Sequence, residues 1–268
     1  MRKRLQSITR ENLSRDQRVL GKAWNQTYKH YFGNPENIQS FVRQILSRVP
    51  KRRKLAILYP ASGSGALGEA LRNALKKKRV EASLTLVDAS ARQLDENKNS
   101  STKKILQDLL APRLNGRFDV AIMRSSLDYF PTERLQANVL SMVRKHLAKG
   151  GVFFNQAASM PTLTERNLAD QIYDSTTKIG RRHFQCPQDI RPIYEKAGFV
   201  KFKKIGSAPK LIVTEKEHQE RYGVTAKEIG RIRKMIGRVP EKKRPNVKTT
   251  QKGYRLKFQF PIYAGWKG

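Results

Sequence analysis

The chain is short of acidic residues, of cysteine and of long apolar runs. Its 268 residues carry 55 Lys and Arg against 22 Asp and Glu, a formal net charge of +33 at pH 7. Such an imbalance opposes compaction unless burial or an anionic partner offsets it. The single cysteine, Cys186, excludes an internal disulfide and a metal cage made of cysteines alone. We interpret Cys186 as a small buried hydrophobe and expect a reducing compartment, the cytoplasm.

The other absences narrow the classes further. No apolar run approaches the roughly 20 residues that span a bilayer, so we expect no membrane segment. No His, Cys and acidic residues stand at metal-ligand spacing, so we expect no metal site. Residues 1–10 contain no acid, a faint sign of an organelle-targeting leader, but Glu11 and Asp16 follow closely and weaken that sign.

Positive charge is concentrated at the two ends of the chain. The first 54 residues hold 14 basic and 3 acidic side chains, and the last 68 hold 19 and 5. The middle 146 residues hold 22 and 14, which is near the balance of an ordinary domain. Dense positive charge at both ends favours a polyanionic partner, and the alternative is a solvated basic surface with no ligand.

Short apolar segments alternate with helical patterns along the middle of the chain. Strands are predicted at 55–59, 83–87, 104–106, 119–123 and 152–155, and helices at 37–49, 66–77, 89–97 and 132–148. This alternation predicts a parallel, doubly wound α/β sheet. Further on, the patterns predict helices at 163–178, 190–196 and 225–236, and strands at 199–205 and 255–263.

These patterns divide the chain into four parts. We expect a basic helical extension over 1–54, an α/β core over 55–206, a basic helical or loop insertion over 207–253, and a terminal strand over 254–268 that completes the core sheet.

A glycine-rich turn follows the first predicted strand. Gly63, Gly65 and Gly68 match the pattern G-x-G-x-x-G, and Asp88 ends the next strand twenty residues later. Glycines let the backbone approach a nucleotide closely, and an acid at that place accepts hydrogen bonds from ribose hydroxyls. The combination favours nucleotide binding over a tight turn without a ligand.

Four segments, in this order and spacing, resemble the class I S-adenosylmethionine-dependent methyltransferases. They are Ile57–Leu67 (ILYPASGSGAL), Leu84–Ala89 (LTLVDA), Phe118–Pro131 (FDVAIMRSSLDYFP) and Leu147–Phe154 (LAKGGVFF). The resemblance covers roughly residues 37–205. It implies a Rossmann-like, doubly wound, mostly parallel seven-stranded sheet whose last strand is antiparallel, and S-adenosylmethionine as the cofactor.

The resemblance also implies roles for individual residues. Gly63 and Gly65 would line the methionine part and the ribose, Asp88 would hold the ribose hydroxyls, and Asp108 and Leu109 would lie beside the adenine. The full set expected to bind the cofactor is Tyr59, Ala61, Gly63, Gly65, Asp88, Ala89, Asp108, Leu109, Met123 and Ser125.

One position departs from that family. An acid usually ends the first strand, but this chain has Tyr59 there, followed by Pro60. The change leaves open weakened cofactor binding, or a relative that has lost catalysis.

The tip of the fourth strand supplies the candidates for chemistry. Asp128 and Tyr129 stand where substrate-facing residues occur in this family, and Arg124 is a candidate to hold a carboxylate or a phosphate. A helix cap is the alternative for Asp128, and an ion pair for Arg124. We interpret His183 as a surface residue rather than a catalytic base.

The candidate nucleic-acid contacts are basic side chains of the two flanks. They are Lys51, Arg52, Arg53, Lys54, Arg231, Arg233, Lys234, Lys242, Lys243 and Arg244. Together with the motifs, they make methylation of RNA or of an RNA–protein particle the leading hypothesis. The alternatives are a small-molecule methyltransferase with an anionic substrate, and a non-catalytic nucleic-acid-binding protein on the same scaffold.

Overall fold

The structure, a computed structural model, describes residues 30–111, 114–176 and 180–268. The leader-like residues 1–10 and the first part of the predicted extension lie outside this range. Among the described residues, no helix is long and apolar enough to cross a membrane.

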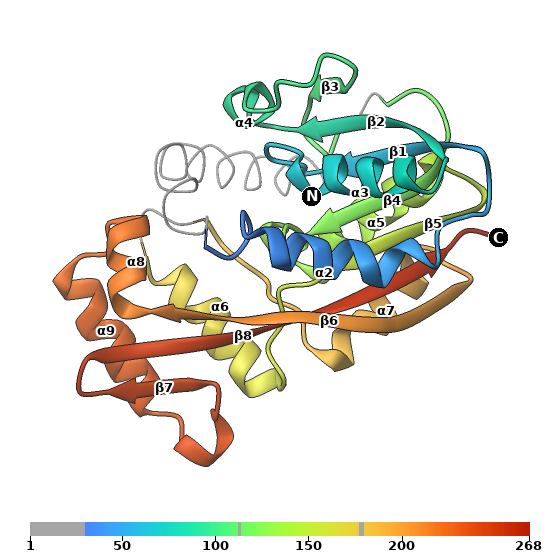
Figure 1. Cartoon of the computed structure of the whole chain (residues 1–268). Helices are drawn as coiled ribbons and strands as arrows, with labels where there is room; N and C mark the ends of the chain where they lie inside the picture. Colours follow the sequence, from blue (N-terminus) through green and yellow to red (C-terminus); the bar gives the residue numbers. More distant parts are fainter. Residues whose placement is uncertain (1–29, 112–113, 177–179) are drawn as a thin grey trace.

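Helices and strands alternate through most of the described chain (Figure 1). The α-helices are α2 (Pro35–Leu46), α3 (Ala66–Lys77), α4 (Ala91–Asp95), α5 (Glu133–His146), α6 (Leu163–Asp174), α7 (Pro187–Lys196), α8 (Glu215–Tyr222) and α9 (Ala226–Gly237). The strands are β1 (Lys54–Pro60), β2 (Glu81–Asp88), β3 (Lys103–Leu106), β4 (Phe118–Arg124), β5 (Leu147–Gln156), β6 (Lys201–Thr214), β7 (Val247–Thr250) and β8 (Gly253–Trp266). Short 3-10 turns are η1 (Leu127–Tyr129) and η2 (Glu241–Lys243).

One mixed sheet forms the centre of the molecule, with strand order β3-β2-β1-β4-β5-β8-β6. Strands β1 to β5 run parallel, and β8 is antiparallel to both β5 and β6. The predicted doubly wound, mostly parallel sheet with an antiparallel last strand is confirmed. The structure adds an eighth strand, β7, which pairs with the free end of β8.

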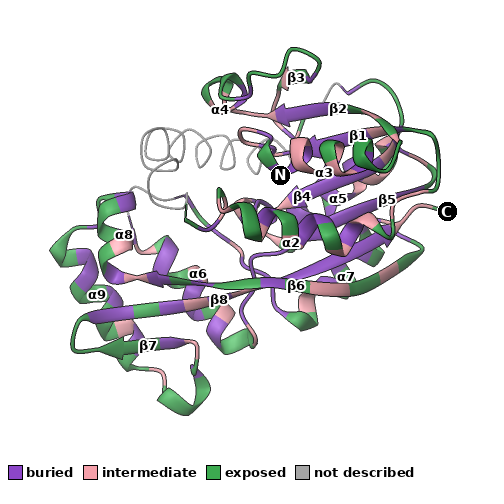
Figure 2. Cartoon of the chain, in the orientation of Figure 1, coloured by how far each residue is buried: buried purple, intermediate pink, exposed green. Residues whose placement is uncertain are grey.

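Alternate side chains of the central strands point into two separate apolar layers. In β1, Ile57 and Tyr59 join the layer covered by α2, α3 and α6, while Leu58 joins the layer covered by α5 and α7. Buried residues colour β1 and β4 almost throughout in Figure 2, whereas the outer faces of the helices are exposed. A strand that is buried on both faces is typical of a parallel sheet between helices.

Strands β6 and β8 form a long ribbon that reaches beyond the rest of the sheet (Figure 1). The insertion, with α8, α9, η2 and β7, sits at its far end, where α6 packs against α9. The predicted boundary at residue 206 falls inside β6, because the strand continues to Thr214. Ala208, Leu211 and Val213 are buried there, and their burial stabilises the strand although polar residues lie between them.

The insertion is ordered by polar contacts, not a loop throughout. Glu215 is buried and accepts two hydrogen bonds from Arg233, from Nε at 2.8 Å and Nη2 at 2.5 Å. It also accepts the Tyr254 N–H at 3.3 Å, so α8, α9 and β8 meet at one carboxylate. Thr214 and Thr225 begin α8 and α9 with capping boxes, each typically worth about 1 kcal/mol.

Candidate active site

The glycine-rich turn after β1 has a left-handed backbone. Ala61, Gly63 and Gly65 have φ angles of 49°, 55° and 77°. A Cβ atom at Gly65 would lie 2.4 Å from Leu86 Cδ1, so only glycine fits there. A non-glycine residue at positive φ, such as Ala61, is strained, and strain of this kind is concentrated at ligand sites. The turn therefore brings its backbone against the end of β2.

Asp88 ends β2 and faces this turn. Its Oδ2 accepts the Gly63 N–H at 2.8 Å, and its Oδ1 accepts the Ser90 N–H at 2.9 Å. Burial raises the pKa of the carboxyl, and the backbone donors of Gly63, Ser90 and Ala89 oppose part of that rise. An ionised carboxylate has about four acceptor positions, so Asp88 keeps capacity for a ribose hydroxyl. The residues present fit the expected cofactor.

The other predicted cofactor residues lie at the neighbouring strand ends. The Gln107 N–H donates to the Asp88 carbonyl at 2.8 Å, which places Asp108 directly after β3 and beside β2. Leu109 and Met123 are buried, and Ser125 follows β4 with a strained φ of 48°. The structure thus gathers the predicted set along one edge of the sheet, and its contact with a cofactor stays a prediction.

Tyr59 stands where the family resemblance leads us to expect an acid. Burial raises the pKa of its hydroxyl, which is hydrogen-bonded to Arg124. Arg124 also donates from Nη2 to the Phe32 carbonyl at 2.7 Å, and its guanidinium lies 5.2 Å from the centre of the Phe32 ring. A phenol and a cation together occupy the place of the missing carboxylate. Arg124 itself is not among the described residues that line the pocket below.

A pocket that is partly open to solvent lies next to the tip of β4, and its empty space, open solvent included, amounts to about 410 Å³. We call it the aromatic pocket. Its described lining residues come from β4 and η1, from α6, from the segment before α7, and from the ribbon and insertion. They are Phe32, Ser125, Asp128, Tyr129, Ala158, Tyr173, Arg182, Phe184, Leu211, Val213, Arg221, Tyr222, Phe258 and Phe260.

Comparisons with known proteins identify solved structures that have a similar fold. No family model matches the chain, and no curated protein matches it. Among solved structures, the YcgJ protein of Bacillus subtilis is similar, with 11% identity over 87% of this chain and 99% of its own, and a TM-score of 0.69. The N-methyltransferase NodS of Bradyrhizobium japonicum, bound to S-adenosylhomocysteine, is 15% identical over 92% of this chain and 97% of its own, with a TM-score of 0.50.

A third match carries both ligands of a methyl transfer. Phosphoethanolamine N-methyltransferase 2 of Haemonchus contortus, with phosphomonomethylethanolamine and S-adenosylhomocysteine, is 13% identical over 94% of this chain and 59% of its own, with a TM-score of 0.58. The chain has the class I methyltransferase fold. In that fold the carboxyl ends of the parallel strands carry the ligands, which is the edge where Asp88, Gly65 and the aromatic pocket lie.

The structure separates the candidates for chemistry in this methyltransferase fold. Asp128 and Tyr129 line the aromatic pocket, and the Asp128 carbonyl accepts the His183 N–H at 2.9 Å. Arg124 lies instead between Tyr59 and the segment before α2. The pocket residues that sequence reasoning missed include Arg182 and Arg221. Only the alternation of Arg182 and Phe184 around His183 could have indicated one of them, since the other walls come from distant parts of the chain.

Three of the predicted nucleic-acid contacts are bonded within the protein, and one of them, Arg244, is wrong as a surface contact. Arg244 is buried, and its guanidinium donates to the carbonyls of Val239 and Val247, each at 2.7 Å, so it offers nothing to a surface phosphate. Arg233 is committed to Glu215, as described above. Arg52 forms an ion pair with Asp119. The other oxygen of that carboxylate, Oδ2, accepts the Ala56 N–H of β1 at 2.9 Å.

The remaining basic candidates are exposed but lie in two separate places. Lys51 and Arg53 precede β1 and Lys54 is its first residue, at the amino end of the parallel strands, opposite the candidate active site (Figure 1). Lys54 lies 3.2 Å from Glu81 in an exposed ion pair. The others, Arg231, Lys234, Lys242 and Lys243, belong to the insertion at the far end of the ribbon. The two basic groups therefore do not form one continuous surface.

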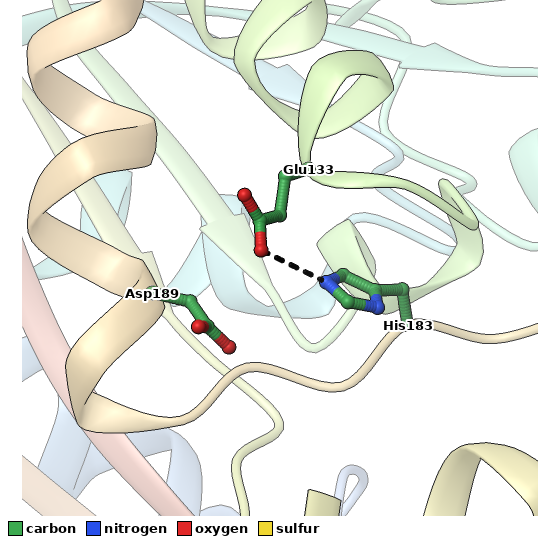
Figure 3. A group of neighbouring side chains, drawn as sticks. All are labelled: Glu133, His183 and Asp189. Carbon is green, nitrogen blue, oxygen red and sulfur yellow. Dashed lines mark ion pairs between the residues drawn. The ribbon is translucent and has the colours of Figure 1, made fainter. Parts of the chain in front are cut away.

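His183 is enclosed, not on the surface as the sequence suggested. Its Nδ1 lies 3.2 Å from Asp170 Oδ2, and its Nε2 lies 4.0 Å from Glu133 Oε1. Glu133, His183 and Asp189 offer potential metal ligands within 4.8 Å of one another (Figure 3), which no sequence spacing indicated. However, Arg166 Nη1 lies 3.0 Å from His183 Nε2 and 3.7 Å from Asp189 Oδ2. A guanidinium at that position repels a metal cation.

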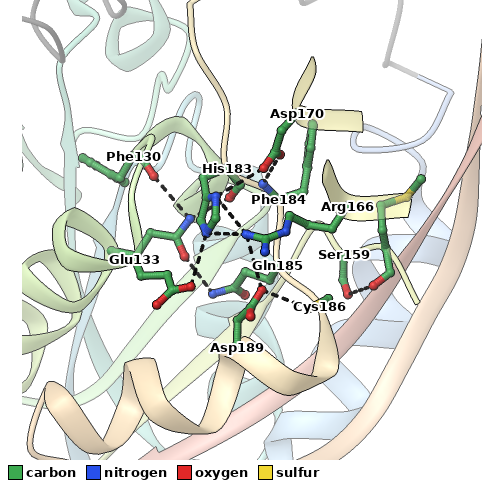
Figure 4. Close-up of polar contacts among 12 residues, drawn as sticks. Phe130, Glu133, Ser159, Arg166, Asp170, His183, Phe184, Gln185, Cys186 and Asp189 are labelled. Atoms are coloured by element: carbon green, nitrogen blue, oxygen red, sulfur yellow. Dashed lines mark hydrogen bonds and ion pairs between the residues drawn. The ribbon is translucent and has the colours of Figure 1, made fainter. Parts of the chain in front are cut away.

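The polar network around His183 supports the pocket wall (Figure 4). Asp170 Oδ1 accepts the Phe184 N–H at 2.8 Å, and Gln136 Nε2 donates to the His183 carbonyl at 2.7 Å. Cys186 is buried, as predicted, and its Sγ donates to Asp189 at 2.9 Å. Burial raises the pKa of the Cys186 thiol to about 11, so it is not a nucleophile at neutral pH.

Proposed function

We propose that this protein transfers a methyl group from S-adenosylmethionine to a small molecule held in the aromatic pocket. One observation carries the proposal: the pocket begins at Ser125 and Asp128, directly beyond the tip of β4 and along the same sheet edge as Asp88. A methyl donor held by the turn and Asp88 would therefore face an acceptor in the pocket.

The residues of the turn and the strand ends would hold the donor. Gly63 and Gly65 would let it approach the backbone, and Asp88 would orient its ribose. When bound, the donor supplies a methyl group on a positively charged sulfur, which a lone pair of the acceptor attacks in line. Positioning provides much of the rate in such a reaction. Asp128, at the β4 side of the pocket, would accept the proton that an amine or hydroxyl acceptor loses.

The pocket walls favour a small acceptor over a nucleic acid as the methylated substrate. Tyr173, Tyr222 and Phe258 come from α6, α8 and β8, and Phe184 comes from the segment before α7, and all four line the pocket. The insertion supplies Arg221 and Tyr222, so it contributes to a wall of the pocket. A concave lining that is mostly apolar and carries a few polar groups is typical of small-molecule sites.

A second candidate is RNA or another polyanion as substrate or partner. The exposed Arg231, Lys234, Lys242 and Lys243 of the insertion favour it, because grouped cations release counterions when they bind phosphates. We place the protein in the cytoplasm, a location that its single buried thiol supports.

Calorimetric titration with S-adenosylmethionine tests the first step. We expect binding that Asp88→Asn weakens at least about tenfold, because one hydroxyl acceptor on a charged group is lost. Asp95→Asn, an exposed acid on α4, is the control and should bind as the wild type does. Absence of binding by the wild-type protein would contradict methyl transfer and support a non-catalytic role.

Transfer of tritiated methyl into separated cell fractions tests the acceptor class. We expect label in the small-molecule fraction. Label in RNA with none in small molecules would replace the leading proposal by the second candidate.

A further inference from the structure

Arg124 ends β4, and the groups that it contacts are uncharged. Its Nη2 donates to the Phe32 carbonyl at 2.7 Å, its guanidinium lies 5.2 Å from the centre of the Phe32 ring, and it donates to the Tyr59 hydroxyl oxygen. Among the described residues, no carboxylate forms an ion pair with Arg124. An arginine stays charged at every physiological pH. This half-buried cation therefore keeps its attraction for an anion.

The guanidinium of Arg124 also keeps hydrogen-bond donors for such an anion. It carries five N–H groups, and the Phe32 carbonyl and the Tyr59 hydroxyl are two acceptors. Within the described chain, no Arg124 nitrogen is both buried and without a hydrogen bond. A nitrogen that has no acceptor in the protein is therefore open to solvent, where a ligand can reach it.

The neighbouring strand β1 ends in a neutral group beside this cation. Burial raises the pKa of the Tyr59 hydroxyl, while Arg124 lowers that pKa and Asp88 raises it. The phenol is therefore uncharged at neutral pH and lies within electrostatic reach of both charged groups. An acid at this place would attract an ammonium group, whereas an uncharged phenol next to a guanidinium does not.

The order of the strands aligns these groups with the parts of the cofactor. Strands β3, β2, β1 and β4 are neighbours in this order, and at or just after their carboxyl ends stand Asp108, Asp88, Tyr59 and Arg124. S-adenosylmethionine has its adenine, ribose, sulfur and amino-acid end in linear order. With the adenine beside β3 and the ribose at Asp88, the amino-acid end extends towards β1 and β4, which lie about 5 and 10 Å from β2.

We infer that Arg124 binds the carboxylate of the cofactor's amino-acid end and thereby determines which way that end faces. A guanidinium and a carboxylate form charge-assisted hydrogen bonds, which are stronger than bonds between neutral groups. The opposite orientation would bring an ammonium group against the guanidinium, which repels it. This inference rests on the cofactor binding of the proposed function, and it holds whichever acceptor is methylated.

Three adenosine thioethers test this inference on the full-length protein. S-adenosylhomocysteine carries both groups, the aminopropyl thioether of adenosine lacks the carboxylate, and the carboxypropyl thioether lacks the amino group. In calorimetric titrations, we expect the aminopropyl thioether to bind at least about tenfold more weakly than S-adenosylhomocysteine, because a charge-assisted contact is lost. Removal of the amino group should change the affinity by less than about threefold. An acid at the end of β1 would predict the reverse order.

Variants assign the preference for a carboxylate to one side chain. Arg124→Met should weaken S-adenosylhomocysteine and the carboxypropyl thioether about tenfold to a hundredfold, and should leave the aminopropyl thioether within about threefold. Arg134→Met, at an exposed position of α5, is the matched control and should bind all three as the wild type does. If Arg124→Met fails to fold, Arg124→Lys keeps the charge without the planar fork, and the preference should shrink but not invert.

Two results would overturn the inference. One is an aminopropyl thioether that binds as tightly as S-adenosylhomocysteine, and the other is an Arg124→Met variant that weakens all three ligands equally. Titration of the same samples with S-adenosylmethionine separates this failure from failure of the proposed function. A protein that binds S-adenosylmethionine without a preference for the carboxylate refutes the inference alone. One that binds neither S-adenosylmethionine nor any thioether refutes the proposed function, and with it the inference.

Discussion

The cofactor turn and the aromatic pocket share one edge of the sheet, but they draw on the chain in different ways. The turn and Asp88 come from thirty consecutive residues, Tyr59 to Asp88, on two paired strands. The pocket takes side chains from Phe32 to Phe260, across nearly the whole described chain. The first region depends on backbone geometry, and the second depends on side chains brought together by the complete fold.

This difference determines how each region responds to mutation. In the turn, φ angles and close backbone approach leave almost no freedom at Gly65. In the pocket, the apolar walls are also buried members of the hydrophobic core, so we expect effects on chemistry without loss of folding only at polar lining residues such as Asp128. The following predictions test this separation between the two regions.

The largest effect is expected in the turn. Gly65→Val combines a left-handed φ of 77° with a clash against Leu86, at a cost of about 3 kcal/mol or more in the free energy of unfolding. Binding of S-adenosylmethionine should fall below detection. Gly230→Val is the control, because a Cβ there meets nothing within 4 Å in an exposed part of α9, and should change stability by under about 0.5 kcal/mol. Equal effects at the two glycines, measured by urea unfolding, would contradict the account of the turn.

The next effect separates chemistry from cofactor binding. Asp128→Asn removes the proposed proton acceptor and should lower the initial rate of tritiated methyl transfer about a hundredfold. Affinity for S-adenosylmethionine should stay within about twofold, because Asp128 lies on the pocket side. Asp95→Asn should change neither quantity. A parallel loss of cofactor affinity in Asp128→Asn would show that the two regions are not separable.

The insertion behind the pocket should make stability depend on pH. His218 is fully buried and bonded to Tyr254 Oη at 2.8 Å, and burial lowers its pKa from 6.5 to about 3. The unfolded chain therefore takes up a proton near pH 6.5 that the folded chain excludes, so stability falls as pH falls. The loss amounts to about 1.5 kcal/mol between pH 6.5 and 5.

His218→Gln keeps a hydrogen-bonding group but does not titrate. Urea unfolding at the two pH values should show a shallower loss of stability in this variant than in the wild type. The same pH dependence in both proteins would mean that His218 is not the cause.

The smallest effect on the folded protein concerns the two basic groups. Replacing Arg231 and Lys234 by Gln should change stability by under about 0.5 kcal/mol, since both are exposed. If the insertion binds RNA, the slope of log affinity against log salt should fall by about 1.4 for two lost contacts with a single strand. The same replacement at Lys51 and Arg53, on the opposite edge, should leave that slope unchanged. Identical losses from both pairs would mean that both edges contact the polyanion.

Sequence patterns predicted what is local in the chain. The succession of the parallel strands along the chain, the turn at Gly63 and Gly65, and the place of Asp88 follow from short motifs whose spacing sets their geometry. The predicted end of α5 was less accurate. The sequence pattern extended the helix to residue 148, but the helix ends at His146 and β5 begins at Leu147. The length of β6 was missed since its polar residues conceal the buried Ala208, Leu211 and Val213.

The partners of charged residues could not be predicted. Arg244 and Arg52 looked like surface cations, yet burial commits the first to backbone carbonyls and Asp119 pairs with the second. Arg182 and Arg221 were overlooked for the same reason, because they meet in the pocket lining only through the complete fold, from positions 39 residues apart in the sequence. Charge counts describe the chain as a whole, while the function of one arginine depends on where the fold places it.

The ribbon of β6 and β8 has a consequence for the order of folding. β8 follows every other described element in the sequence, yet it lies between β5 and β6 in the sheet and supplies Phe258 and Phe260 to the pocket. During synthesis, the turn at Gly65 can therefore form long before the pocket does, because contacts between distant segments are slow to form. While β8 is still inside the ribosome, the strands that carry the cofactor residues can already pair. The pocket for an acceptor cannot form until β8 has emerged.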